Sequence, residues 1–227
     1  MNGEIAEPKH MRQQTAGDLQ PTPTEDTLVR RFADFATLGE ALDYAASGNR
    51  GLNFHDARGT LVRPYPFAEL RDDAKAQAYR LIAAGVKPGE RIALIAETGP
   101  EFASLFFGVV YAGAWPVPLP LPTSFGGAQS YIEQLRVQLS SCDPTMLIYP
   151  AELAAMAGEA AKLCNVTGID WASFGQREAK PCDLPEAKTD DTAYLQYSSG
   201  STRFPHGVAI THGALLNNLA AHSHGMK

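Results

Sequence analysis

The chain is poor in cysteine and in positive charge. It has three cysteines, Cys142, Cys164 and Cys182, and no two of them are closely spaced. This odd, scattered set argues against a disulfide framework and a zinc site, and it indicates a reducing, cytoplasmic setting. The 19 lysines and arginines are outnumbered by 25 aspartates and glutamates, which gives a formal net charge of -6. An acidic balance of this kind argues against a nucleic-acid-binding surface.

A long apolar run free of proline is also missing. The segment from Phe102 to Pro122 carries no charge, but its second half contains Pro116, Pro118, Pro120 and Pro122. The helix-forming remainder, Phe102 to Ala114, is shorter than the about 20 residues that a membrane-spanning helix needs. We therefore expect a buried core helix there and no membrane span. The N-terminus lacks a basic stretch followed by an apolar run, so we also expect no signal peptide.

Hydrophobic periodicity predicts an α/β fold. Residues 1–26 are polar and rich in Pro, Thr and Gln, so we expect a flexible tail, followed by one folded part over residues 27–227. Strand-like and helix-like segments alternate from Arg91 to Asp170, which is typical of a mostly parallel sheet flanked by helices. Turn residues between Leu52–His55 and Leu61–Tyr65 predict a β-hairpin near the N-terminus.

Other segments fill in this scheme. Leu28 to Ala46 has apolar residues near helical spacing, which predicts one or two short helices. The connection from Trp171 to Asp191 is polar and is expected to be irregular. The remaining expected helices are 67–84, 100–112, 130–139, 151–163 and one beginning after Thr211, and the expected strands are 91–96, 115–118, 145–149, 166–170, 193–197 and 208–210.

The segment after Tyr197 has the clearest chemical use. Ser198, Ser199, Gly200, Ser201 and Thr202 are small or hydroxylated and lie between two apolar runs that we expect to be buried strands. Small residues let backbone N–H groups approach an anion, and hydroxyls add donors, so the loop suits a polyphosphate. Arg203 and His206 could contact phosphate oxygens. Composition alone also fits a plain surface turn, and the Walker A pattern is absent.

The run from Tyr197 to Val208 resembles the phosphate-loop signature of the adenylate-forming superfamily. That signature reads Tyr, Ser or Thr, Ser, Gly, Ser, Thr, Gly, any residue, Pro, Lys, Gly, Val. The chain departs from it twice, with Arg203 at the glycine position and His206 at the lysine position. It matches at Tyr197, Ser198, Ser199, Gly200, Ser201, Thr202, Pro205, Gly207 and Val208. Further similarity extends over roughly residues 40 to 225.

The resemblance implies an N-terminal part of an adenylate-forming enzyme. Members of this superfamily continue into a second half of the large domain and a mobile C-terminal domain, so catalytic residues are expected beyond Lys227. They activate a carboxylate with ATP and Mg²⁺, giving an acyl-adenylate and pyrophosphate. By this resemblance, Ser198 to Thr202 would hold the β- and γ-phosphates, and Arg203 could partly replace the missing lysine charge.

The proline-rich segment after Gly113 narrows the branch. Acyl-CoA synthetases usually have a segment ending Asn-Pro there, whereas this chain reads Trp115 to Pro122 without that asparagine. The segment is similar to fatty acyl-AMP ligases, which pass fatty acids to an acyl carrier protein or to a polyketide or peptide synthase. A fatty acyl-CoA synthetase is the near alternative, and a proline-stiffened loop without functional meaning is the simplest interpretation.

A non-catalytic binding or interaction module is the alternative from another class. The chain lacks the superfamily's later motifs, so we expect the 227 residues alone to be inactive. His212, His222 and His224 have spacings that form no recognised metal set, so we interpret them as structural or surface residues.

Overall fold

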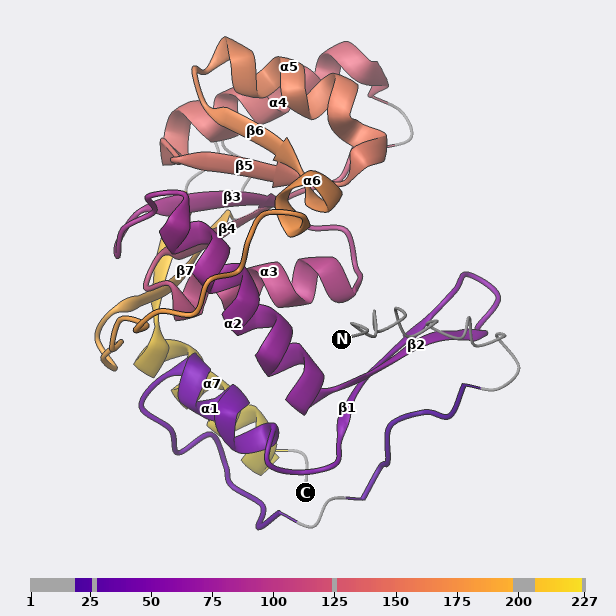
Figure 1. Ribbon diagram of the computed structural model, residues 1–227, viewed down its shortest axis with the longest axis vertical. Coiled ribbons are helices and arrows are strands. Elements are labelled where there is room, and N and C mark those ends of the chain that lie inside the picture. The colour runs from indigo at the N-terminus through magenta and orange to yellow at the C-terminus, as the bar shows by residue number, and fades with distance from the viewer. Residues whose placement is uncertain (1–18, 26–27, 124–125, 198–206, 226–227) are drawn as a thin grey trace, which may run out of the picture.

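The protein is a three-layer α/β structure with two attached hairpins (Figure 1). This computed structural model describes residues 19–25, 28–123, 126–197 and 207–225. The helices are α1 (Leu38–Ala45), α2 (Phe67–Ala83), α3 (Pro100–Tyr111), α4 (Gly127–Cys142), η1 (Ala151–Leu153), α5 (Ala154–Leu163), α6 (Trp171–Gly175) and α7 (His212–Gly225). The strands are β1 (Gly51–His55), β2 (Leu61–Pro66), β3 (Arg91–Ile95), β4 (Trp115–Leu119), β5 (Met146–Tyr149), β6 (Thr167–Asp170), β7 (Thr192–Tyr197) and β8 (Gly207–Thr211).

The central sheet is parallel and has the strand order β4-β3-β5-β6. Its strands alternate with helices in the chain, as parallel pairing requires, because each crossover returns the chain to the same end of the sheet. The predicted α/β class and the N-terminal hairpin β1–β2 are confirmed. No helix in the described part of the chain is both long and apolar enough to span a bilayer.

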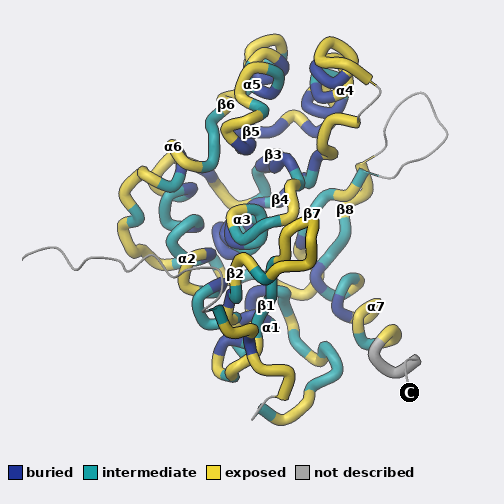
Figure 2. The backbone as a smooth tube through the Cα atoms, turned by 90° about the vertical axis from the view of Figure 1, so that its right-hand side faces the viewer, coloured by how far each residue is buried: buried dark blue, intermediate teal, exposed yellow. Residues whose placement is uncertain are grey.

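Successive residues of the central strands enter two different cores. Ile92 and Leu94 of β3 pack with α2 and α3 on one face. Ala93 and Ile95 pack with α4 and α5 on the other face. Figure 2 shows buried segments on β3, on β5 and on the inner sides of α4 and α5. Because both faces are covered, these strands are continuous apolar runs and show no alternation of polar and apolar residues.

Two expected segments differ from the sequence prediction. The stretch from Leu28 to Ala46 forms a helix only from Leu38, because Ala33 has a positive φ of 56° that a right-handed helix cannot contain. The connection after Trp171 is not wholly irregular, since it opens with α6. The Asp170 side chain accepts the backbone N–H of Ser173 at 2.9 Å and Phe174 is buried, so this short helix is capped and anchored.

The segment before α1 lies against the first hairpin. Thr22 is buried, its backbone N–H donates to Asn53 Oδ1 at 2.9 Å, and Asn53 Nδ2 donates to the Thr22 hydroxyl at 3.1 Å. Most of the predicted tail, residues 1–18 and 26, lies outside the described residues.

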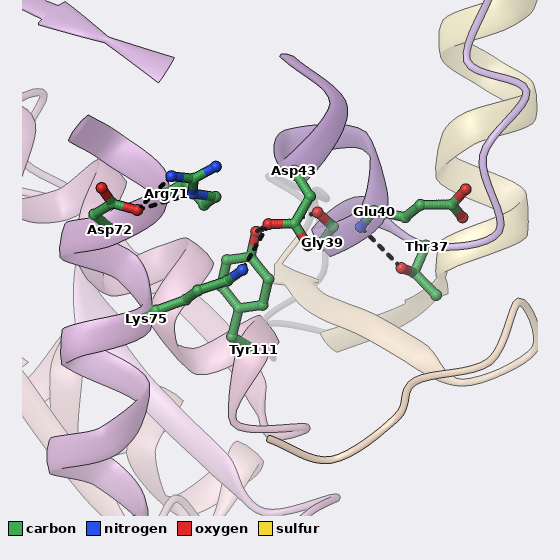
Figure 3. A network of polar contacts seen from close by, with 8 residues as sticks. All are labelled: Thr37, Gly39, Glu40, Asp43, Arg71, Asp72, Lys75 and Tyr111. Atoms are coloured by element: carbon green, nitrogen blue, oxygen red, sulfur yellow. Dashed lines mark hydrogen bonds and ion pairs between the residues drawn. The ribbon is translucent and has the colours of Figure 1, made fainter. Parts of the chain in front are cut away.

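A polar network fastens α1 to α2 and α3 (Figure 3). Asp43 Oδ1 accepts hydrogen bonds from Lys75 Nζ at 2.8 Å and from the Tyr111 hydroxyl at 2.9 Å. The Lys75 ammonium also lies 5.2 Å from the centroid of the Tyr111 ring. Burial raises the pKa of Tyr111, so its hydroxyl stays protonated and donates to Asp43 at every physiological pH.

Cys142 is the last residue of α4 and lies in the core between α4, α5 and the sheet. Its side chain is buried, and burial raises the pKa of its thiol to about 11. Cys164 is half-buried and Cys182 is exposed, and all three cysteines are free thiols.

Replacement of Gly108 by alanine should destabilise the protein although alanine favours helices. A Cβ at this position of α3 would lie 2.5 Å from Gln77 Cβ and 2.9 Å from the Ala74 carbonyl oxygen on α2. Overpacking of this kind lowers the free energy of unfolding by about 1–3 kcal/mol, which exceeds the gain of about 1 kcal/mol in helix propensity. Urea unfolding measures the change.

Gly158→Ala in α5 is the matched control for Gly108→Ala. A Cβ there would meet only the Tyr149 hydroxyl, at 3.5 Å, which is ordinary contact. Without a clash the propensity gain remains, so this variant should be more stable by about 0.5–1 kcal/mol. Equal stability changes in the two variants would contradict the close packing of α2 on α3.

Tyr111→Phe should lower the free energy of unfolding by about 1 kcal/mol, because it removes the hydroxyl that donates to Asp43 and to the Gly39 carbonyl and leaves the ring packing intact. The control is Tyr79→Phe on α2, whose half-buried ring has no hydrogen-bond partner among the described residues. This control should stay within about 0.5 kcal/mol of the native protein. Denaturant unfolding of the two variants would refute the network if their midpoints coincided.

Candidate functional site

The loop singled out in the sequence joins the two strands of the hairpin β7–β8. The strands are antiparallel, and Tyr197 and Gly207 are register partners at the loop end of the ladder. The predicted site residues Ser198, Ser199, Gly200, Ser201, Thr202, Arg203 and His206 lie outside the described residues. The described part of the site is therefore the frame that holds both ends of this loop.

One face of β7 is fixed to the core beneath α4. Leu195 and Tyr197 pack against that core, and the Tyr197 hydroxyl donates to the Gln138 carbonyl oxygen at 3.1 Å. Burial raises the pKa of Tyr197 to about 12, so the donor is neutral at physiological pH. The last residue before the loop is thus held by packing and by one hydrogen bond.

The other face of β7 contacts α3. The Tyr194 ring lies 5.9 Å from the Phe106 ring in a tilted arrangement, and the Tyr194 hydroxyl donates to Gln196 Oε1 at 3.0 Å. Aromatic pairs at this separation stabilise a contact by about 0.5–1.5 kcal/mol beyond their buried area. The two tyrosines therefore fasten β7 from opposite sides.

β7 runs beside β4 without joining its ladder, and the prolines of β4 explain why. The Trp115 N–H donates to the Glu90 carbonyl at 2.7 Å on the β3 side, so alternate residues of β4 face β3. Pro116 and Pro118 would point their N–H groups the opposite way, but proline has none. The outer edge of β4 therefore offers no donors to β7.

The second strand of the hairpin is not buried, so the prediction of two buried strands is wrong for β8. Gly207, Val208 and Ala209 are exposed, and β8 pairs only with β7 among the described residues. Gly207 is also constrained by its partner strand, because a Cβ there would lie 2.6 Å from Leu195 Cδ2. An apolar run of three residues cannot by itself distinguish an outer strand from a central one.

The base of the hairpin is joined to the preceding linker. The His212 N–H donates to the Asp191 carbonyl at 3.0 Å, and the Gly213 N–H donates to the Thr189 carbonyl at 2.9 Å. The Thr211 hydroxyl accepts the Ala214 N–H at 3.2 Å, so Thr211 caps α7, the helix predicted to begin after it. His212 is buried, and nothing in the local sequence indicated how deeply it lies.

The described frame and the loop that it holds differ in the ligand groups that they offer. Among the described residues, no three His, Cys, Asp or Glu side chains come together as a metal site would require. The hydroxylated, glycine-containing loop has the donor set for phosphate oxygens, and both of its ends are fixed by Tyr197 and Gly207. The residue types of the loop between Tyr197 and Gly207 are therefore compatible with a phosphate group as ligand.

Comparison with known proteins agrees with the resemblance seen in the sequence. A protein of Caulobacter vibrioides provisionally named as an acyl-CoA synthetase is 42% identical over 203 residues, which cover 89% of this chain and 35% of that protein. A long-chain-fatty-acid–AMP ligase of Mycobacterium marinum is 31% identical over 204 residues, covering 87% of this chain and 30% of the ligase. The chain thus spans about a third of the length of these relatives.

Solved structures give the same result. A chain from structural studies of fatty acyl-adenylate ligases of E. coli and L. pneumophila matches with a TM-score of 0.80 and 41% identity, over 86% of this chain and 35% of that one. A fatty acyl-adenylate ligase from L. pneumophila in complex with acyl adenylate and pyrophosphate matches with a TM-score of 0.69 and 25% identity, over 85% of this chain and 33% of the ligase. The family model described as AMP-binding enzyme matches residues 58–227. The chain therefore belongs to the family of AMP-binding enzymes, and it corresponds to an N-terminal part of an adenylate-forming enzyme.

Proposed function

We propose that the complete protein is a fatty acyl-AMP ligase, and that residues 27–227 are the N-terminal part of its adenylation domain. The observation that carries this proposal is the loop from Ser198 to His206, which keeps most of the phosphate-loop signature and is closed by the Tyr197–Gly207 pair. The fatty acyl-AMP ligases among the relatives support the substrate class.

The reaction is attack of a fatty acid carboxylate oxygen on the α-phosphorus of ATP. A bond forms between that oxygen and the phosphorus, the bond to the bridging oxygen of the β-phosphate breaks, and pyrophosphate leaves with the electron pair. The work of the protein is to hold the phosphorus in line and to stabilise the developing charge. Ser198, Ser199, Gly200, Ser201 and Thr202 would grip the β- and γ-phosphates, and a nucleotide-bound Mg²⁺ would supply further neutralisation.

Two residues of the loop change its electrostatics. His206 stands where the signature has lysine, and an unperturbed imidazole is mostly neutral at pH 7. Arg203 stands where the signature has glycine and is always charged, so it would supply the positive charge with a different geometry.

The proposed acceptor of the acyl group is a carrier protein or a polyketide or peptide synthase. The proline-rich β4 segment without the usual asparagine supports this branch, as do relatives such as an L-proline–[L-prolyl-carrier protein] ligase and a hybrid polyketide–peptide synthetase. Coenzyme A is the second candidate, favoured by the Caulobacter relative. Incubation of the complete enzyme with labelled fatty acid, ATP and either acceptor separates the two, since only the true acceptor becomes acylated.

The proposal includes a cytoplasmic location, in keeping with three free thiols.

We also propose that the 227 residues alone do not turn over substrate. If the complete protein binds ATP or a partner protein but shows no turnover, a non-catalytic interaction module is the better description of it. Pyrophosphate exchange and acyl-hydroxamate formation by the complete enzyme, with medium and long fatty acids, test the activity directly. The absence of an ATP-dependent signal with every carboxylate would refute it.

Ser201→Ala and Thr202→Ala should each lower kcat/KM for ATP in the complete enzyme. Each removes a hydroxyl donor to a charged phosphate, and such hydrogen bonds contribute about 1.5–3 kcal/mol, which corresponds to a loss of about 10- to 150-fold. ATP–pyrophosphate exchange measures the change.

The control for these loop variants is Ser130→Ala, an exposed serine in the first turn of α4. Its exchange rate should equal that of the native enzyme. If both loop variants behaved like this control, the loop would not be the phosphate site.

A further inference from the structure

The side chain of His212 makes a long-range hydrogen bond to α1, and the proposed reaction gives this bond no role. Its Nδ1 accepts the backbone N–H of Leu38 at 3.1 Å, and the side chain is only 2% exposed. Leu38 is the first residue of α1, so its N–H has no acceptor within the helix. The Thr37 side chain caps a different group, the N–H of Glu40 at 3.1 Å, which leaves the Leu38 donor to the imidazole.

The backbone of His212 lies at the base of the hairpin β7–β8. Thr192 and Thr211 pair at that end of the ladder, and the His212 N–H donates to Asp191, the residue before β7. Gly213 packs so closely on the linker that a Cβ would lie 2.7 Å from Thr189 Cγ2. The imidazole is therefore attached to a rigid junction where both strands meet.

The other end of the contact is also rigid. α1 is fastened to α2 and α3 through Asp43, which binds Lys75 and Tyr111 (Figure 3). Thus a continuous set of contacts leads from the core helices through α1 and His212 to the strands that carry the loop. Because the outer edge of β4 supplies no backbone donors, the hairpin depends on such side-chain contacts for its position.

We propose that His212, as a neutral imidazole accepting from Leu38, is a positioning residue for adenylation that fixes the base of the β7–β8 hairpin and hence the grip of the loop on the nucleotide. This inference rests on the proposed function. The acceptor must be the unprotonated Nδ1, so the ring carries its proton on Nε2. Protonation of Nδ1 would replace an acceptor by a second donor facing the Leu38 N–H, and the bond would be lost.

The charged groups around His212 influence the pH at which its Nδ1 becomes protonated. Asp191 lies close enough to favour the protonated ring, while Glu186 and Asp190 line the same small pocket on the linker side. On the α1 side, the Glu40 carboxylate is engaged by the Ala36 N–H at 2.8 Å. Burial outweighs Asp191 and lowers the pKa of His212 from its ordinary value of about 6.5. The hydrogen bond is therefore present at neutral pH, and its stabilisation is lost as the pH falls below about 6.5, where the unfolded chain binds the proton more tightly.

The test uses the complete enzyme with His212→Asn and His212→Ala. Asparagine offers a non-titrating acceptor in a similar position, whereas alanine offers none. We expect His212→Ala to raise KM for ATP on the order of tenfold. In the native enzyme, protonation of His212 should raise the KM for ATP as the pH falls, which gives the pH profile an acid limb. We expect His212→Asn to keep a KM near that of the native enzyme at neutral pH and to lack this acid limb. Amide hydrogen exchange of the β8 peptide, measured without nucleotide, should accelerate in the alanine variant alone.

The control is His55→Asn, an exposed histidine of β1, which should leave the pH profile unchanged. If His212→Ala fails to fold, the pH profile and exchange of His212→Asn decide the matter. The inference is overturned if the asparagine variant retains the native acid limb, or if a folded alanine variant keeps native KM and native β8 exchange. An inactive native enzyme would instead refute the proposed function, so the two failures are distinguishable.

Discussion

The outer edge of β4 has no backbone N–H donors, and this constraint decides how the hairpin β7–β8 is held in place. A strand with prolines at alternate positions can pair on one side only, so the central sheet ends at β4. The chain still places β7 beside this edge, and it must hold that strand by other means. Two tyrosines of β7 provide them, since Tyr194 packs against α3 and Tyr197 donates a hydrogen bond to α4, and the hydrogen bond between His212 and Leu38 adds a third contact. Because side chains hold the hairpin, a single substitution can change its position. In a continuous ladder the backbone hydrogen bonds would hold it whatever the side chains.

Much of the fold could be predicted because its signals are local. The continuous apolar run of β3 and the Pro100 and Gly113 boundaries of α3 each fixed an element without knowledge of the rest. The interpretation of Tyr197–Val208 as a phosphate loop also rests on an ordered set of small residues, and it stays a prediction because residues 198–206 lie outside the described part of the chain. Each of these inferences depends only on residues that are close together in the sequence, so the sequence alone was sufficient for it.

The remainder depended on contacts between distant segments. The exposure of β8 follows from its place outside β7, which no property of Val208 or Ala209 reveals. The left-handed conformation of Ala33 ended a helical pattern that its apolar spacing favoured. The contact of His212 with Leu38 spans 174 positions of the chain, and a buried histidine looks like any other in the sequence. Tertiary context therefore decided the parts that local pattern could not.

The buried thiol of Cys142 is a built-in probe of how often the layer formed by α4 and α5 opens. Its raised pKa and its position in the core between α4 and the sheet keep it from becoming a thiolate while α4 is in place, whereas Cys182 is exposed to solvent. An alkylating reagent would thus modify Cys182 at once and Cys142 only when α4 transiently separates from the sheet. The ratio of the two reactions would report how often the upper layer opens, without any introduced label.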